Sequence, residues 1–144
     1  MSQLVVDSSV VIKWFVVEPY TTEARRILAD YQAGALTLLA PDLVYAEIGN
    51  ILWKKHVLQG MAAADAQLVL DTFRTLPLIV TPTAVLLERA YRLAVLHRRT
   101  VYDMLYVALS AQAACPFVSA DEKLVNAIQA ALPSTIWLGK WPLS

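Results

Sequence analysis

Residues 4–9 of this chain read Leu-Val-Val-Asp-Ser-Ser, an apolar run that ends on an acid followed by two serines. Such a short apolar run is typical of a buried strand, which places Asp7 at the carboxyl end of that strand. In open parallel sheets, ligands bind outside the carboxyl ends of the strands, close to the point where the strand order reverses. This stretch therefore predicts an α/β fold and a position for a functional site.

Further short apolar segments alternate with helical patterns along the rest of the chain. Strands are expected at residues 36–39, 78–80, 117–118 and 135–138. Helices are expected at residues 8–15, 21–32, 41–56, 62–74, 83–97, 100–114 and 121–131, with Thr21 or Thr22 capping the second. This alternation predicts a mostly parallel sheet of four or five strands covered by helices on both faces. No linker or repeat divides the chain, so residues 1–144 are expected to form one domain.

The composition favours a globular cytoplasmic protein. Hydrophobic residues make up 58% of the 144 residues, and the charged 17% balance to a formal net charge of zero. The longest uncharged stretch, residues 104–120, is interrupted by Pro116 and is too short to cross a bilayer. No signal peptide is visible ahead of Asp7. The single cysteine, Cys115, can form no intrachain disulfide, which fits a reducing compartment.

Four acidic residues are candidates for chemistry. Asp7 and Asp121 both lie close behind a predicted strand, at its carboxyl end. Glu47 has apolar residues four positions before and after it, so it shares the apolar face of a predicted helix. A carboxylate on such a face loses hydration unless something pairs with it. Asp103 lies in the first turn of another predicted helix.

Most of these acids also have a purely structural interpretation. Asp7 can be the N-cap of the helix that follows it. Asp103 has nearly the spacing of a capping box with the threonine before it. Ser119 and Glu122 have the full spacing, which would leave Asp121 as a first-turn acid stabilised by the helix dipole. Glu47, on the apolar face of a predicted helix, is harder to explain by capping.

Taken together, the four acids favour a metal site. Carboxylates that lie close together repel one another and stay ionised only if a cation neutralises them. Oxygen donors without histidine or cysteine suit Mg²⁺ or Mn²⁺. Such an ion can activate water and stabilise the leaving oxygen of a phosphodiester. With these acids set aside, the twelve basic residues outnumber the acids that remain, so a nucleic-acid substrate is compatible with zero net charge.

Four segments of the chain also resemble a known family: VVDSSVVIKWF, PDLVYAEIGNILWK, TVYDMLYVALS and FVSADEKLVNAI. In their order and spacing the chain resembles a PIN-domain nuclease, and more narrowly a VapC-type toxin of a toxin–antitoxin pair. The resemblance implies that Ser9 supports the site as a hydrogen-bond donor and makes Asn126 a further polar candidate. Met104 departs from the pattern, which usually has a small residue there. The resemblance places catalysis and metal binding on Asp7, Glu47, Asp103 and Asp121.

The same resemblance implies a three-layer α/β/α sandwich, an Mg²⁺ or Mn²⁺ cofactor and cleavage of RNA phosphodiester bonds. It also implies a homodimer and a cognate antitoxin, and we expect no membrane partner. Basic residues near the predicted site are Lys13, Lys54, Lys55, Arg98, Arg99 and Lys123. Lys13, Lys54 and Lys123 are candidates for contacts with the RNA backbone, and a solvated charged surface is the alternative.

Two other functions remain as alternatives. A PIN-like fold can serve as a binding module without catalysis, although such a scaffold has no need for mutually repelling acids. A phospho-accepting signalling domain also has an acid at a strand end. That class needs an acidic pair before the acceptor and a lysine at a late strand end, and neither stands out here.

Overall fold

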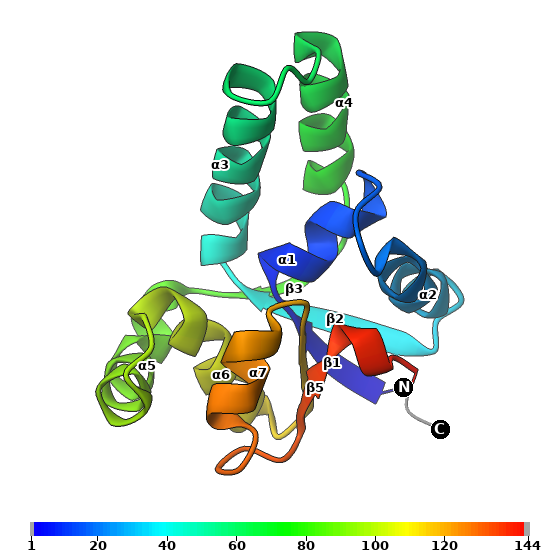
Figure 1. Cartoon of the computed structure of the whole chain (residues 1–144). Coiled ribbons are helices and arrows are strands. Elements are labelled where there is room, and N and C mark those ends of the chain that lie inside the picture. The colour runs from blue at the N-terminus through cyan, green and yellow to red at the C-terminus, as the bar shows by residue number, and fades with distance from the viewer. Residues whose placement is uncertain (1, 143–144) are drawn as a thin grey trace.

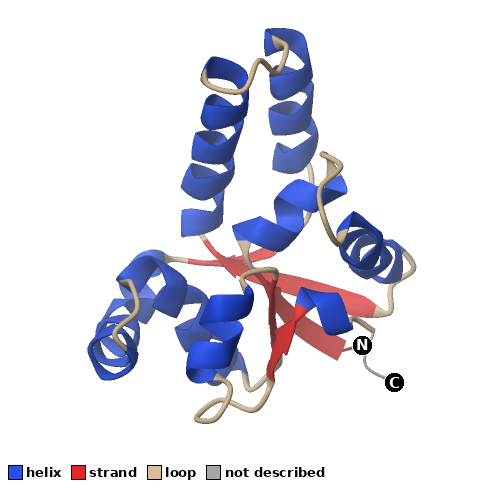
Figure 2. Cartoon of the chain, in the orientation of Figure 1, coloured by secondary structure: helices blue, strands red, loops and turns tan. Residues whose placement is uncertain are grey.

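The computed structural model describes residues 2–142 and gathers them around one sheet (Figures 1 and 2). The strands are β1 (Ser2–Val6), β2 (Leu36–Pro41), β3 (Ile79–Thr81), β4 (Phe117–Ser119) and β5 (Thr135–Trp137). Their order is β3-β2-β1-β4-β5, and all four pairs are parallel. β1 lies at the centre, and its residues Leu4, Val5 and Val6 are buried, as their apolar character predicts. The predicted parallel sheet is confirmed.

Helices cover both faces of this sheet. In Figure 1, α5, α6 and α7 lie on one side of the sheet and α2 on the other, which is the expected α/β/α sandwich. α3 and α4 form a hairpin that projects away from the sheet. The bounds are α1 (Ser8–Val11), the 3₁₀ turn η1 (Ile12–Trp14), α2 (Thr21–Gln32), α3 (Leu43–Val57), α4 (Ala63–Arg74), α5 (Thr83–His97), α6 (Val101–Ala113), α7 (Glu122–Ile128) and the 3₁₀ turn η2 (Leu138–Lys140).

The strand order reverses at β1. The chain runs outwards from β1 to β2 and β3, and then returns to the other side of β1 with β4 and β5. Because crossovers between parallel strands are right-handed, the helices before and after β3 fall on opposite faces. Asp7 directly follows β1, and Asp121 follows β4 by two residues. Both acids therefore lie at the position where parallel sheets of this kind bind ligands.

Several helix ends differ from the sequence prediction, and two of these differences concern capping and termination. The N-cap of α2 is Tyr20, in a left-handed conformation with φ of 67°, rather than one of the two threonines after it. The Thr21 hydroxyl instead closes the preceding loop, where it accepts a hydrogen bond from a backbone amide at 2.8 Å. α7 ends at Ile128, three residues earlier than predicted. Pro133 explains part of this, since it disfavours a helical conformation at the residue before it.

The core accounts for several other features of the sequence. Met104 is completely buried in α6, so it is a packing residue of the core. Cys115 is a buried free cysteine.

Between residues 2 and 142, no helix combines the length and apolar character that crossing a membrane requires. The expectation of one domain over residues 1–144 extends beyond the described residues and stays a prediction.

Candidate active site

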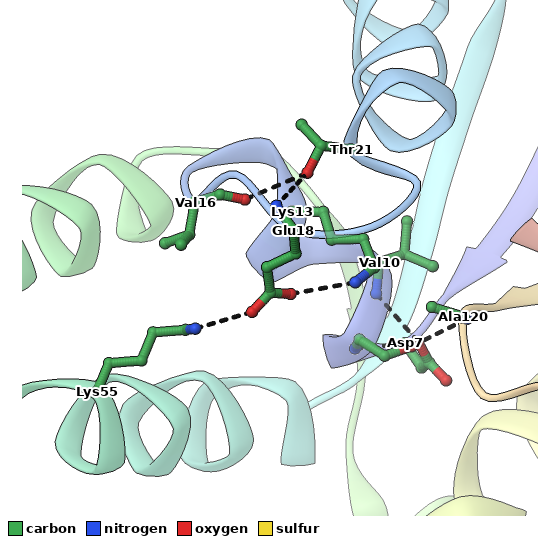
Figure 3. Close-up of polar contacts among 9 residues, drawn as sticks. Asp7, Val10, Lys13, Val16, Glu18, Thr21, Lys55 and Ala120 are labelled. Atoms are coloured by element: carbon green, nitrogen blue, oxygen red, sulfur yellow. Dashed lines mark hydrogen bonds and ion pairs between the residues drawn. The ribbon is translucent and has the colours of Figure 1, made fainter. Parts of the chain in front are cut away.

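Asp7 is the most deeply buried of the four acids. Its Oδ1 accepts hydrogen bonds from the amides of Ser9 (3.1 Å) and Val10 (3.3 Å), and also from the Ser9 hydroxyl. Figure 3 shows Asp7 beside Val10. Its Oδ2 accepts a hydrogen bond from the Ser119 hydroxyl at 2.6 Å. Burial raises the pKa of Asp7 to about 6 against these hydrogen bonds, which lower it, and the charge of Glu47 adds to the rise. The carboxylate is thus firmly held where its charge is poorly solvated.

Glu47 is partnered on the buried side of α3. Its side chain is half-buried, and the Tyr106 hydroxyl of α6 donates a hydrogen bond to its Oε1. Burial raises the pKa of Glu47, hydrogen bonds from Tyr106 and Ser8 lower it, and the charge of Asp103 raises it. Burial, and then the Glu47 carboxylate, raise the pKa of Tyr106. Glu47 therefore has the hydrogen-bond partner that a carboxylate needs on an apolar helix face.

Asp103 and Asp121 both form an ion pair with Arg99. Asp103 lies in the first turn of α6, where its amide donates to the Thr100 hydroxyl at 3.1 Å. Asp121 is the N-cap of α7 and accepts a hydrogen bond from the Leu124 amide at 3.1 Å. Nη2 of Arg99 lies 3.4 Å from Oδ2 of Asp103 and 3.7 Å from Oδ2 of Asp121. Burial raises the pKa of Asp103, Arg99 lowers it, and Asp121 raises it.

Two of the four acids in the site are also helix N-caps. Asp7 is the N-cap of α1, which is the structural role that the sequence allowed. Asp121 is the N-cap of α7 and not the first-turn acid of the alternative interpretation. The capping box expected from Ser119 and Glu122 is wrong. The Ser119 hydroxyl accepts from the Asp121 amide at 3.1 Å and donates to Asp7, so it links the two strand-end acids.

The four acids form one electrostatic group. Glu47 raises the pKa of Asp7, Asp103 raises that of Glu47, and Asp121 raises that of Asp103. As the side chains are oriented, no three Asp, Glu, His or Cys residues between positions 2 and 142 form a group that could hold a metal ion. Their oxygens face hydroxyls, helix amides and a guanidinium instead. The donors themselves, oxygen-only and mutually repelling, fit Mg²⁺ or Mn²⁺, and a bound ion would replace some of these contacts.

Comparison with known proteins identifies the family. Residues 4–128 match the PIN domain. The chain belongs to the PIN domain family. It is 33% identical over 129 residues to ribonuclease VapC3 of Pyrobaculum aerophilum, covering 86% of this chain and 93% of that protein.

Solved structures show the same fold. The crystal structure of PAE2754 from Pyrobaculum aerophilum has a TM-score of 0.69 and 21% identity, covering 96% of this chain and 85% of that one. A toxin–antitoxin complex from Klebsiella pneumoniae has a TM-score of 0.62 and 16% identity, covering 92% and 95%. These similarities show that most of the chain, 96% and 92% of it in the two comparisons, shares the fold of these structures.

The two supporting residues named from the sequence behave differently in this PIN domain. The Ser9 hydroxyl donates to Asp7 and accepts from the Ala120 amide at 3.0 Å, so it bridges the loops that follow β1 and β4. Asn126 is exposed on α7 and, within residues 2–142, has no hydrogen bond to any of the four acids. The structure therefore brings Ser9 to the acids but not Asn126.

Two of the three candidate RNA-binding lysines line a groove beside the acids. Nζ of Lys13 lies 3.1 Å from Oε1 of Glu18, and Nζ of Lys55 lies 2.8 Å from Oε2 (Figure 3). Burial raises the pKa of Glu18, but hydrogen bonds from Lys55 and Lys13 outweigh it and lower the pKa. Lys123 is exposed on α7 and does not line this groove. The groove, about 270 Å³, is lined by Ser9, Lys13, Glu18, Ile51, Lys54 and Lys55, among others.

Among the side chains that contact the acids, Tyr106, Ser119 and Arg99 have no such role in the sequence prediction. Tyr106 follows Asp103 by three residues and so shares its helix face, which is a usable signal. In the sequence, Ser119 is only the residue that follows a short apolar run. Its position beside β1 follows from the strand order, which the sequence does not show. The sequence identifies Arg99 only as a basic residue near the site, because a charged residue at a helix end is usually solvated.

The geometry of Asp7 disfavours the phospho-acceptor hypothesis. Only 7% of the residue is exposed, and both carboxylate oxygens accept hydrogen bonds from the protein. Asp7 would have to release one of these hydrogen bonds before it could attack a phosphodonor. The lysine that this class needs is not among the hydrogen-bond partners of Asp7 in the described part of the chain.

Proposed function

We propose that this protein is a metal-dependent endoribonuclease and the toxin of a VapBC-type toxin–antitoxin pair. The observation that carries this proposal is the group of four coupled acids at the strand-order reversal of a PIN domain. The 33% identity to a protein named ribonuclease VapC3 supports RNA as the substrate. The bond cleaved is accordingly a phosphodiester.

The chain itself would provide the ligands of the ion and their orientation. A bound Mg²⁺ or Mn²⁺ would activate water and stabilise the leaving oxygen. Ser9 and Ser119 hold the two oxygens of Asp7, and Tyr106 holds Glu47. Removal of partners of this kind typically lowers metal affinity or activity about 10- to 100-fold. The proposed metal ligands and catalytic residues are Asp7, Glu47, Asp103 and Asp121.

Cleavage of RNA by the purified protein is expected to depend on the divalent ion. An excess of EDTA should abolish cleavage of a mixed RNA substrate, and added Mn²⁺ or Mg²⁺ should restore it, because the acids repel one another and the RNA phosphates without a cation. The measurement is product formation on a denaturing gel across a metal titration. Undiminished cleavage in EDTA would contradict metal dependence. No cleavage with any ion, together with no Mn²⁺ binding in calorimetry, would favour the silent binding module.

We also propose that the RNA backbone binds in the lysine-lined groove. Three of the chain's lysines line it against one glutamate, so the groove is net positive although the chain is neutral. Ser9 lines the groove and also contacts Asp7, so an RNA strand in the groove would continue into the acid site. The proposed phosphate contacts are Lys13 and Lys54, together with Lys55, which lines the same groove. Lys123 is a separate candidate on α7.

The double variant Lys54→Gln/Lys55→Gln is expected to bind RNA with a weaker salt dependence. Each phosphate contact contributes about 0.7 to the slope of log K against log salt for a single strand, so the slope should fall by about 1.4. Fluorescence anisotropy of a labelled single-stranded RNA in EDTA measures this without cleavage. Lys140→Gln is the matched control, because Lys140 is exposed at the end of η2 and does not line the groove. Equal slopes in the double variant and this control would contradict the proposal.

The proposed partners are a cognate antitoxin and a second copy of the chain, and the proposed location is the cytoplasm. The fold of the toxin–antitoxin complex from Klebsiella pneumoniae supports an antitoxin. Large apolar side chains on the surface support protein partners: Trp53 and Leu68 on the α3–α4 hairpin, and Tyr91 and Val95 on α5, are each more than half exposed. Light scattering of the purified chain, alone and with the product of an adjacent small gene, would test both partners.

A further inference from the structure

Arg99 lies between two of the four acids. It follows Arg98, which ends α5 in a left-handed conformation with φ of 53°, and its own amide donates to the Ala94 carbonyl at 3.2 Å. This turn directs the guanidinium to Asp103 and Asp121, at 3.4 and 3.7 Å. The side chain of Arg99 is about three-quarters buried, with 26% of its surface exposed. Arg99 is therefore part of the wall of the acid site.

The hydrogen bonding of Arg99 indicates what holds it there. Its Nε is buried and has no hydrogen-bond partner among the residues described. An arginine free to choose its conformation would expose that N–H to water, because an unpaired buried donor is unfavourable. The attraction of the two carboxylates offsets this loss. Arg99 is thus held by the negative charge of the site and not by a complete hydrogen-bond network of its own.

The same two oxygens are those that a metal ion would need. Arg99 faces Oδ2 of Asp103 and Oδ2 of Asp121. The other oxygen of Asp121 caps α7, so the oxygen facing Arg99 is the one left for a ligand outside the helix. A guanidinium and a divalent ion cannot both occupy this position, and their positive charges repel.

We propose that Arg99 is an internal counter-ion, which a divalent ion must displace from Asp103 and Asp121 in order to bind. This inference rests on the proposed metal-dependent function. In the metal-free protein Arg99 neutralises part of the repulsion among the acids. It therefore lowers the affinity of the site for metal and sets a minimum ion concentration for activity, before any antitoxin is involved.

Calorimetric titration of Mn²⁺ into RNA-free protein tests this directly. Arg99→Gln is expected to bind Mn²⁺ about three- to tenfold more tightly than the wild type, since it removes a competing, partly exposed charge. Arg98→Gln is the matched control: it makes the same charge change one residue away, on an exposed side chain that is not paired with the acids. Arg99→Lys keeps the charge and should stay close to wild type. Circular dichroism verifies that each variant is folded.

Thermal unfolding gives a second readout that needs no activity. In EDTA, Arg99→Gln should unfold at a lower temperature than Arg98→Gln, because the acids lose their counter-ion, and saturating Mn²⁺ should remove the difference. Mn²⁺ affinity in Arg99→Gln that is equal to or weaker than in Arg98→Gln would overturn the inference. So would equal unfolding temperatures in EDTA. Absence of Mn²⁺ binding in the wild type and in every variant would instead overturn the proposed metal site on which this inference depends.

Discussion

Asp7→Asn is expected to reduce RNA cleavage at least about 1000-fold while the protein stays folded. A metal ion contributes several kcal/mol to the stabilisation of the transition state, and about 1.4 kcal/mol corresponds to a factor of ten in rate. Asparagine keeps the size of the side chain and is an equally good N-cap, so the helix contacts of Asp7 can survive. What is lost is the negative charge at the strand-order reversal.

Single-turnover cleavage at saturating Mn²⁺ measures this loss, and circular dichroism monitors the fold. Asp65→Asn is the matched control, because Asp65 lies exposed in the first turn of α4, away from the sheet. It makes the same chemical change and should leave cleavage unchanged. Cleavage by Asp7→Asn within a few-fold of this control would exclude Asp7 as a catalytic ligand.

The metal-free wild-type protein is expected to be more stable near pH 5 than near pH 8. The folded state keeps the Asp7 proton up to a pKa of about 6, whereas the reference value is 3.8. Between these values the folded protein binds more protons than the unfolded chain, so the free energy of unfolding falls as the pH rises through this window. Between pH 5 and pH 8 about one pKa unit of this difference is lost, which corresponds to roughly 1.4 kcal/mol. Raised pKa values of Glu47 and Asp103 act in the same direction.

Urea unfolding in EDTA between pH 5 and pH 8 tests this expectation. The lower limit matters because Glu18 has a lowered pKa and contributes the opposite trend below its usual value of 4.5. Asp7→Asn has no proton to release at this position, so most of the pH dependence should disappear in that variant. A flat wild-type profile would show that Asp7 is not held in a charge-disfavouring environment.

Metal should reverse the direction of the pH effect. Ligating carboxylates must be ionised, so protons compete with the ion and metal affinity rises with pH. The acid that destabilises the metal-free fold at neutral pH is then the one that a metal ion would exploit. In the metal-free protein, hydroxyl groups donate hydrogen bonds to Asp7 and Arg99 pairs with Asp103. These contacts stabilise the ionised carboxylates, which burial and mutual repulsion destabilise.

The strands, most helix ends and the four candidate acids could be predicted from local patterns in the amino-acid sequence. Local periodicity and capping chemistry are short-range, so the run before Asp7 and the threonine that caps α6 could be interpreted without knowledge of the rest of the chain. The structural and functional interpretations of Asp7 could not be separated at that level. In the folded protein Asp7 is a helix cap and also a member of the acid group.

The groups that surround the acids follow from the packing of distant segments against one another. Ser119 reaches Asp7 across 112 residues because β4 pairs with β1, and Tyr106 reaches Glu47 across 59 residues because α6 packs near α3. The position of Arg99 between two acids depends on how α6 and α7 approach one another. Such contacts depend on strand order and packing, and no local pattern of side chains encodes them. The stretch at residues 4–9 therefore predicts where the site lies, whereas the fold decides which groups balance its charge.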